Sequence, residues 1–313
     1  ADNGVGMASA LAVLADDTVK HGPLEVLLTM TEETGMDGAF GLQPGWLQAD
    51  ILINTDSEEE GEIYMGCAGG IDVKTTVDLT YEAIPANHIV KKLVLKGLNG
   101  GHSGGDIHLG LGNANKLLAR FLAKHADELA LKLIDFHGGT LRNAIPREAH
   151  IIFAIPADKA TQLNSITTEF EALLKSELAI AEKNLAIELT DTSTEKPVFT
   201  ADCQSRTINL LNAMPNGVIR MSDDVEGVVE TSLNVGVVSI VDDKVEILCL
   251  IRSLIDSGKT YVVSMLTALA KLAQADIETK GGYPGWKPDA DSPVMHLVRD
   301  TYQQLFDKVP NIM

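Results

Sequence analysis

The sequence predicts an α/β catalytic domain with a second, α+β domain inserted into it. At the start of the chain, a helical segment of small residues at 4–15 is followed by two apolar, strand-like runs at 24–31 and 49–55, as in an α/β layer. From 71 to 81 apolar and polar residues alternate, which is typical of a half-exposed antiparallel strand. Beyond it, strands and helices follow the order βαββαβ, the split βαβ of ferredoxin-like folds.

The inserted domain is predicted to contain two similar sets of elements. The first set is strand 88–95, helix 113–125, strands 129–136 and 150–155, helix 159–183 and strand 185–190. The second set is helix 202–213, strands near Val218, Leu233 and Val245, helix 258–275 and strand 276–280. Their similar order indicates a duplicated lid, although no sequence repeat accompanies it. A helix at 293–306 would return to the first layer, so we expect domain boundaries at 1–69, 70–282 and 283–313.

Four carboxylates lie near the predicted strand ends. Asp2 opens the chain, Glu32 and Glu33 follow the first apolar run, and Asp56 follows the second. Ligands of open α/β sheets bind beyond the carboxyl ends of the strands, so we expect these side chains to converge on one crevice. A hydrolytic metal site also needs a base that is not itself bound to the metal, and adjacent glutamates can divide these two roles. A glutamate pair in a turn is otherwise usually solvated.

The amino-acid sequence around these carboxylates resembles that of a known family. The segments ADNGVG at 1–6, TEETGMDGA at 31–39 and NTDSEEEGE at 54–62 are similar to the M20 family of co-catalytic zinc peptidases, in the group that contains the carnosinases and other Xaa-His dipeptidases. The resemblance runs through the whole chain. It implies a metallopeptidase that hydrolyses dipeptides with a C-terminal histidine, carnosine-like molecules included.

The resemblance assigns roles to the carboxylates and implies two zinc ions per subunit, for which Co²⁺ or Mn²⁺ can substitute. Asp2 matches the carboxylate that bridges both ions, Glu33 a ligand of one and Asp56 a ligand of the other. Glu32 matches the general base. Two cations about 3.5 to 4 Å apart need a shared anion between them to offset their repulsion, which agrees with the bridging role.

The chain departs from the family pattern at both ends. Family members carry a His-x-Asp motif before the segment that begins here and a further ligand histidine near the C-terminus, and neither has a counterpart in this sequence. Each zinc ion would then lack one histidine, and sites with two protein ligands bind metal weakly. We therefore expect an internal fragment of a longer enzyme that is itself inactive.

The inserted domain carries a second set of matching residues. His102 lies in the glycine-rich segment LNGGHSGG; the resemblance implies that it reaches the active site of the partner subunit of a homodimer formed through the lid and stabilises the oxyanion. Asn143 matches a substrate-contacting asparagine, and Arg252 the arginine that binds the substrate's C-terminal carboxylate, a task suited to a planar guanidinium. Without the family, a loop histidine is more often a surface residue, and Arg252 is equally well a surface ion-pair partner.

Composition narrows the classes of partner. The net charge of −19 argues against nucleic acid and anionic membranes, which bind basic patches, so we expect a small peptide substrate. The apolar runs are too short for a membrane-spanning helix. Three widely spaced cysteines, Cys67, Cys203 and Cys249, are expected to be free, mostly buried thiols in a reducing cytoplasm.

Two other functions compete with the dipeptidase. A lid that dimerises without a complete zinc site would be a folded but non-catalytic dimerisation or metal-binding module. A third possibility keeps the chemistry and changes the substrate to tripeptides or acylated amino acids. The residues alone do not select the histidine preference, which follows from the resemblance.

Overall fold

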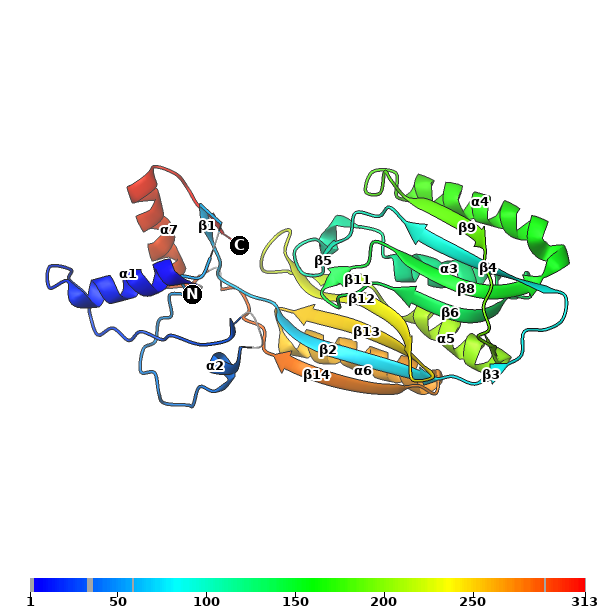
Figure 1. Ribbon diagram of the computed structural model, residues 1–313. Helices are drawn as coiled ribbons and strands as arrows, with labels where there is room; N and C mark the ends of the chain where they lie inside the picture. Colours follow the sequence, from blue (N-terminus) through cyan, green and yellow to red (C-terminus); the bar gives the residue numbers. More distant parts are fainter. Residues whose placement is uncertain (1–2, 33–35, 58, 290, 313) are drawn as a thin grey trace. The chain divides into compact units, whose positions relative to one another are not determined.

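The computed structural model describes residues 3–32, 36–57, 59–289 and 291–312. The chain divides into two compact units (Figure 1). The first unit combines Ala1–Met65 with Asp291–Met313, and the second unit comprises Gly66–Ala290. The inserted position of the second unit brings the two ends of the chain into the first.

The first unit contains three helices and one short ladder among its described residues. Helix α1 (Gly4–Ala15) begins at Asn3, whose side chain accepts a hydrogen bond from the backbone N–H of Gly6 at 2.6 Å, as a helix N-cap does. Helix α2 spans Asp37–Phe40, and α7 spans Pro293–Phe306 with proline in its first turn, where the missing N–H costs nothing. Strand β1 (Glu62–Ile63) pairs in parallel with β15 (Asn311–Ile312).

The two predicted strands of the first unit are wrong. Residues 24–31 and 49–55 form no strand, and their apolar side chains are exposed, with Leu28 57% and Leu52 76% accessible. A strand exists only where a neighbour takes up its backbone N–H and C=O groups. Within the described part of the first unit, β1 and β15 form the only ladder. The apolar pattern therefore indicated extended segments, but it did not show whether a neighbouring strand would pair with them.

The second unit is built on a nine-stranded antiparallel sheet (Figure 1). Along the sheet the order is β14-β2-β13-β12-β6-β8-β4-β9, with β11 (Gly217–Met221) pairing with β12. The strands are β2 (Gly69–Asp78), β4 (His88–Lys96), β6 (Lys132–Gly138), β8 (Ala149–Pro156), β9 (Ala186–Asp191), β12 (Val229–Val241), β13 (Lys244–Ser253) and β14 (Asp276–Tyr283). Two short ladders accompany it, β3 (Tyr81–Glu82) with β10 (Val198–Phe199) and β5 (Gly101–His102) with β7 (Ala144–Ile145).

The sheet joins two groups of four strands. One group has the order β9-β4-β8-β6 and the other β14-β2-β13-β12, and they meet where Val238 of β12 pairs with Gly138 of β6. Glycine is required at this junction. A Cβ on Gly138 would lie 2.0 Å from the side-chain oxygen of Asn115, and one on Gly139, where φ is +70°, would lie 1.9 Å from the carbonyl oxygen of Gly236.

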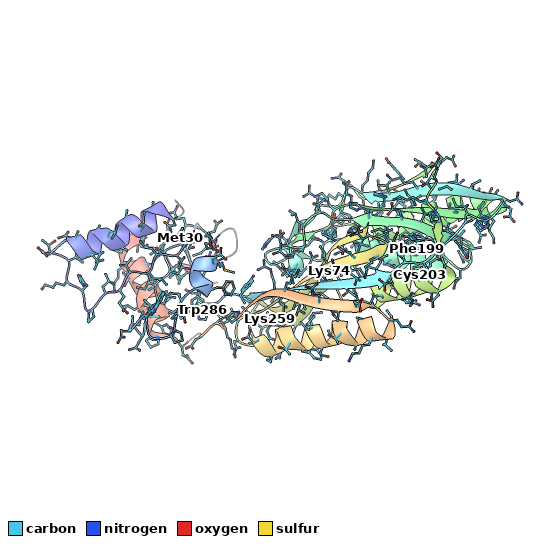
Figure 2. All side chains as sticks on the ribbon, turned by 60° about the horizontal axis from the view of Figure 1, so that its bottom comes forward. Met30, Lys74, Phe199, Cys203, Lys259 and Trp286 are labelled. Carbon is cyan, nitrogen blue, oxygen red and sulfur yellow. The ribbon has the colours of Figure 1, made fainter. Side chains whose placement is uncertain are left out.

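The core of the second unit lies between this sheet and its helices. Alternate strand residues and the apolar faces of α3 (Ala114–His125), α4 (Ala160–Glu177), α5 (Ala201–Ala213) and α6 (Asp256–Leu272) form one continuous cluster. The predicted helices and strands of this unit are confirmed, although their ends differ by a few residues. The largest difference is at helix 159–183, since α4 ends at Glu177. Cys203 and Cys249 are buried as expected, with Cys203 near Phe199 (Figure 2), but Cys67 is exposed.

Replacing Phe153 by alanine is expected to lower the free energy of unfolding by about 3 to 5 kcal/mol, because the side chain is fully buried in the centre of β8 and its loss leaves a cavity. Urea unfolding followed by circular dichroism measures the change. Ile180→Ala is the matched control, since Ile180 is 92% exposed and its truncation is expected to change stability by less than about 0.5 kcal/mol. Equal effects of the two substitutions would contradict this description of the core.

Candidate functional site

The lid brings His102 and Asn143 together through a short ladder. In the pairing of β5 with β7, His102 lies opposite Ala144. The backbone N–H of Ser103 also donates to the carbonyl oxygen of Asn143 at 2.8 Å. His102 is exposed and Asn143 is half-buried. Two of the three lid residues predicted from the sequence therefore lie close together, with His102 on β5 and Asn143 in the turn just before β7.

The glycine-rich turn orients the His102 ring. Its Nδ1 atom accepts hydrogen bonds from the backbone N–H groups of Gly104 at 3.3 Å and Gly105 at 3.1 Å, and the backbone N–H of His102 donates to Asp106 at 2.8 Å. With Nδ1 occupied as an acceptor, the neutral ring carries its proton on Nε2. A Cβ on Gly104 would lie 3.1 Å from His102 Cε1 and 3.3 Å from Arg252 Cζ, so this glycine allows the ring and the guanidinium to approach.

Arg252 joins His102 and Asn143 from β13, in the group of strands β14-β2-β13-β12. It lies near the end of β13, half-buried, with its Nη2 atom 3.4 Å from Nε2 of His102. Both atoms are donors in the tautomer described above, so they do not satisfy each other. The buried Nε of Arg252 also has no hydrogen-bond partner among the described residues. These donors fit an acceptor oxygen, such as a carboxylate or a developing oxyanion, placed against both side chains.

Burial and the neighbouring guanidinium of Arg252 lower the pKa of His102 below its usual value of 6.5, and Asp106 opposes this only in part. The imidazole is therefore neutral at pH 7. We expect the His102 ring to titrate below pH 6.5 when its Cε1 proton is followed by NMR. Arg252→Met should raise the midpoint by removing the positive charge, and a midpoint that is unchanged or lowered in that variant would contradict the contact.

A buried asparagine that the sequence analysis missed holds the Asn143 loop. Asn234, on β12 and 1% exposed, donates from its Nδ2 atom to the carbonyl oxygens of Arg142 at 2.9 Å and Ala144 at 2.8 Å, on either side of Asn143. Asn234 is thus a positioning residue. A single amide in the apolar run SLNVGVV was the signal available, because a buried polar side chain in a strand needs a specific partner.

Asn234→Leu is expected to reduce the free energy of unfolding by about 2 to 4 kcal/mol, because it leaves two carbonyl groups without their donor. Thermal and urea unfolding measure the loss. Asn209→Leu is the control, since Asn209 is exposed on α5. If Asn234→Leu were as stable as the control, the asparagine would have no part in holding the loop.

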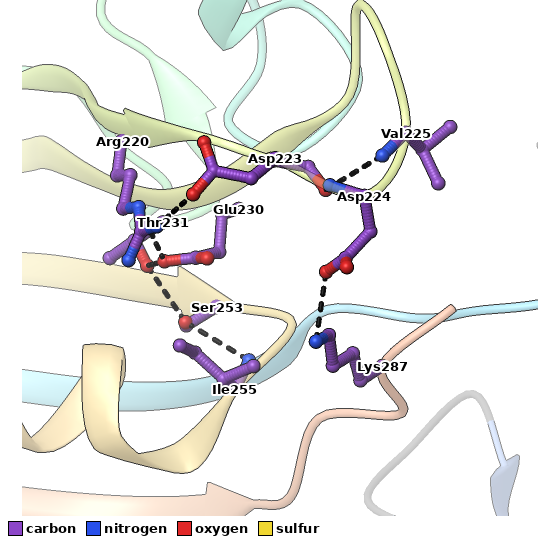
Figure 3. A network of polar contacts seen from close by, with 10 residues as sticks. Arg220, Asp223, Asp224, Val225, Glu230, Thr231, Ser253, Ile255 and Lys287 are labelled. Carbon is purple, nitrogen blue, oxygen red and sulfur yellow. Dashed lines mark hydrogen bonds and ion pairs between the residues drawn. The ribbon is translucent and has the colours of Figure 1, made fainter. Parts of the chain in front are cut away.

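A polar network anchors the end of β13 next to Arg252 (Figure 3). The buried hydroxyl of Ser253 lies 2.8 Å from that of Thr231 on β12 and accepts from the backbone N–H of Ile255 at 3.2 Å. Around it are the ion pairs of Arg220 with Asp223 and Glu230 and of Asp224 with Lys287. The hydrogen bonds of Ser253 therefore hold the end of β13, one residue after Arg252.

The predicted metal and base residues lie in the first unit. Asp2 and Glu33 fall outside the described residues. Glu32 and Asp56 are exposed, and the backbone N–H of Asp56 donates to the side chain of Asn54 at 3.0 Å. Among the described residues no group of three or more His, Cys, Asp or Glu side chains is arranged to hold a metal ion.

Two contacts in the first unit concern the neighbours of these carboxylates. The side-chain amide of Asn3 donates to the carbonyl oxygen of Thr55, and a Cβ on Gly6 would lie 2.2 Å from the Thr55 hydroxyl. Close packing of α1 on this segment therefore requires glycine. Thr31, which precedes Glu32, has a φ of +59°, a strained conformation for a β-branched residue.

The Thr31 turn is held by its hydroxyl, which accepts from the backbone N–H of Asp37 at 3.0 Å and donates to the carbonyl oxygen of Met30 at 2.7 Å. Met30 is labelled in Figure 2. Strained residues of this kind concentrate at functional sites because the surrounding structure must hold them in place. Thr31, directly before Glu32, is one such strained residue.

Comparison with known proteins relates the chain to a family of peptidases. Residues 93–182 match the family model described as the peptidase dimerisation domain of the M20 type. The fold, with this domain, is that of the M20 peptidases, and the resemblance indicated by the sequence motifs is confirmed. No helix among the described residues is long and apolar enough to cross a membrane.

Two of the individual relatives carry dipeptidase names. The chain is 69% identical over 312 residues to the cytosol non-specific dipeptidase of Escherichia coli (strain K12), covering 100% of this chain and 64% of the relative. It superposes with a TM-score of 0.96 and 59% identity on the aminoacylhistidine dipeptidase from Vibrio alginolyticus, again covering 100% of this chain and 64% of the other. An uncharacterised protein of Bacillus subtilis (strain 168), YqjE, is 25% identical over 182 residues, 55% of this chain and 44% of its own. The chain thus spans less than two thirds of the length of each of these relatives.

Proposed function

We propose that the protein containing this chain is a metal-dependent dipeptidase that hydrolyses dipeptides, among them those with a C-terminal histidine. The observation that carries the proposal is the convergence of unsatisfied donors from His102 and Arg252 beside the Asn143 loop. A dipeptide offers two groups that such donors recognise, the C-terminal carboxylate and the carbonyl oxygen of the scissile bond. High identity to a dipeptidase supports the same reaction class.

In this proposal each lid residue has a separate role. Arg252 binds the substrate's C-terminal carboxylate with two parallel hydrogen bonds. His102, neutral and protonated on Nε2, donates to the carbonyl oxygen as negative charge develops on it. Asn143 contacts the substrate from the turn just before β7. The Nδ1 contacts with Gly104 and Gly105 keep the Nε2 proton directed away from the turn.

The donor set of the first unit fits divalent cations. Asp2, Glu33 and Asp56 would hold the two zinc ions, because carboxylates are suitable zinc ligands. The bond from Asn3 to Thr55 supports this arrangement, since it joins the residue after Asp2 to the residue before Asp56. When bound, the ions supply polarisation of the peptide carbonyl and acidification of water.

Glu32 is the proposed general base. Its carboxylate takes a proton from the attacking water and later delivers that proton to the leaving amine. The strained Thr31 turn directs the backbone at this position, and the neighbouring Glu33 is then left for metal binding. This division of labour explains why two adjacent glutamates are needed in one turn.

The test is zinc-dependent release of histidine from β-alanyl-histidine by the chain extended to the full length of its relatives. A panel of alanyl-alanine, a tripeptide and an acetylated amino acid defines the substrate class, because the E. coli relative is named a non-specific dipeptidase and the Vibrio relative an aminoacylhistidine dipeptidase. We expect both dipeptides to be cleaved. Cleavage of only the tripeptide or the acetylated amino acid would replace the substrate, and no cleavage with zinc bound would favour a non-catalytic metal-binding module.

We further propose that the lid, residues 70–282 of the predicted domain division, is a duplicated ferredoxin-like unit. Numbered along the chain, the strands of the group β9-β4-β8-β6 are fourth, first, third and second. The group β14-β2-β13-β12 has the same order when its members are numbered in the same way, but its first strand is β2, whereas the sequence pattern had assigned the strand near Val218 (β11) to this set. The helix positions agree, since α3 and α4 connect the first group and α5 and α6 the second.

A homodimer formed through the lid, with His102 serving the active site of the partner, is also part of the proposal, as is a cytosolic location like that in the E. coli relative's name. Mixing the inactive variants Glu32→Gln and His102→Ala of the full-length protein tests the exchange. Recovery of activity on mixing and reassociation is expected if His102 acts across subunits. A dimer without any recovery would place His102 in its own subunit's reaction.

A further inference from the structure

A cavity lies on the face of the nine-stranded sheet that the helices do not cover. It has a volume of about 530 Å³ and is lined by β4, β6, β8 and the loop between the last two. Leu93, Phe136 and Ile151 face the helices in the core. Because strand side chains alternate between faces, their neighbours Lys92, His137 and His150 lie on the opposite face, in the wall of the cavity.

The lining of this cavity is basic. Lys92, Arg147, His137 and His150 contribute to it, with Glu148 as the carboxylate among the lining residues. His137 and His150 are direct cross-strand partners with ring centroids 5.6 Å apart. Lys92 is half-buried, and neither it nor Arg147 forms an ion pair with any of the described residues. Two cationic side chains therefore lack partners in a chain of net charge −19.

A neighbouring cavity on the same sheet shows the contrast. It has a volume of about 300 Å³ and is lined by residues of β2, β13 and β14 together with Arg142. There each cation is matched by a carboxylate: Arg142 pairs with Asp72, Lys74 with Glu246, and Lys280 with Glu278. The unpaired positive charges of the larger cavity are thus absent from this smaller one.

The kind of ligand follows from the charges. A pair of cross-strand histidines is able to bind a transition metal, but Lys92 and Arg147 would repel a cation. Burial and, after it, Lys92 lower the pKa of His150, while Asp135 and Glu148 oppose this shift in part. Anionic oxygens, in contrast, accept hydrogen bonds from ammonium, guanidinium and imidazole groups alike.

We propose that this cavity binds a small anion carrying carboxylate or phosphate oxygens, held by Lys92, Arg147 and the His137–His150 pair. Its volume falls within the range of small-molecule sites. His102, Asn143 and Arg252 do not line it, so it is distinct from the proposed substrate site, although its loop, residues 139–148, also carries Asn143.

NMR titration of the His137 and His150 ring protons tests the proposal, with inorganic phosphate and citrate as separate probes in a background of constant ionic strength. We expect at least one probe to shift both histidines with saturation in the millimolar range or below. Saturation by phosphate alone would assign phosphate oxygens, saturation by citrate alone would assign carboxylates, and saturation by both would assign a general anion site.

Matched variants separate a built site from surface charge. Lys92→Gln and Arg147→Gln should each weaken binding by about tenfold or more, whereas Lys74→Gln, which removes a lysine already paired with Glu246, should leave the affinity unchanged. The proposal is overturned if neither probe saturates, or if Lys74→Gln weakens binding as much as Lys92→Gln. Unchanged chemical shifts in the core of each variant confirm that it remains folded.

Discussion

Glu32→Gln is expected to lower kcat for dipeptide hydrolysis by about 100-fold or more, the usual contribution of a general base. The amide keeps the size of the side chain but accepts no proton from water. Metal content should remain close to that of the unmodified protein, because the proposed ligands are Asp2, Glu33 and Asp56. Steady-state kinetics and metal analysis of the same samples measure both quantities.

The control for this substitution is Glu60→Gln. Glu60 is exposed in the same acidic segment as Asp56, so the change in net charge is the same while the base is retained. We expect kcat within about twofold of the original, because surface substitutions away from functional groups have small effects. Loss of metal together with activity in Glu32→Gln would instead make Glu32 a ligand, and equal losses in both variants would point to the charge of the segment.

Arg252→Lys is expected to raise KM for dipeptides by about 10- to 100-fold, because a charged hydrogen-bonding group contributes about 1.5 to 3 kcal/mol. Lysine keeps the charge but loses the planar pair of donors. The C-terminal carboxylate takes no part in bond breaking, so kcat should change less than KM. A dipeptide with an amidated C-terminus gives a second measurement, since it should be cleaved poorly by both forms and discriminate little between them.

Arg142→Lys serves as the matched control. Arg142 is an exposed arginine on the loop that carries Asn143, and its guanidinium forms an ion pair with Asp72. Exposed ion pairs contribute about 0 to 1 kcal/mol, so KM should change by less than about fivefold. If Arg252→Lys left KM unchanged, or lowered only kcat, Arg252 would not bind the carboxylate and the donors beside His102 would serve another part of the substrate.

The second unit was largely predictable from the sequence because its elements carry local signals. The run 71–81 alternates with period two, and α5 and α6 have apolar faces at helical spacing. Both patterns arise because each strand or helix turns one face toward the core, and side chains return to that face every two residues in a strand and about every 3.6 in a helix. In the first unit, helix α7 was predicted with its observed ends, and the proline in its first turn marks its start.

The parts that could not be predicted depend on contacts between distant residues. Residues 24–31 read as a strand from composition, but strand formation requires a partner that the pattern does not identify. The approach of His102 to Arg252 joins positions 150 residues apart, and it depends on how the two halves of the sheet meet. Likewise, the basic side chains of the cavity at His137 lie together because of the strand register. A slip of one residue would move the side chains of a strand to the opposite face of the sheet.

A double-mutant cycle of His102→Ala and Arg252→Lys on kcat/KM for alanyl-histidine tests most directly whether the two side chains serve one bound substrate. The two sites share a contact of 3.4 Å, so the account predicts that the double variant loses less than the sum of the single losses, with a coupling energy of about 1 kcal/mol or more. Strictly additive losses would mean that the two groups act independently. Single variants as active as the original would contradict the proposed site itself.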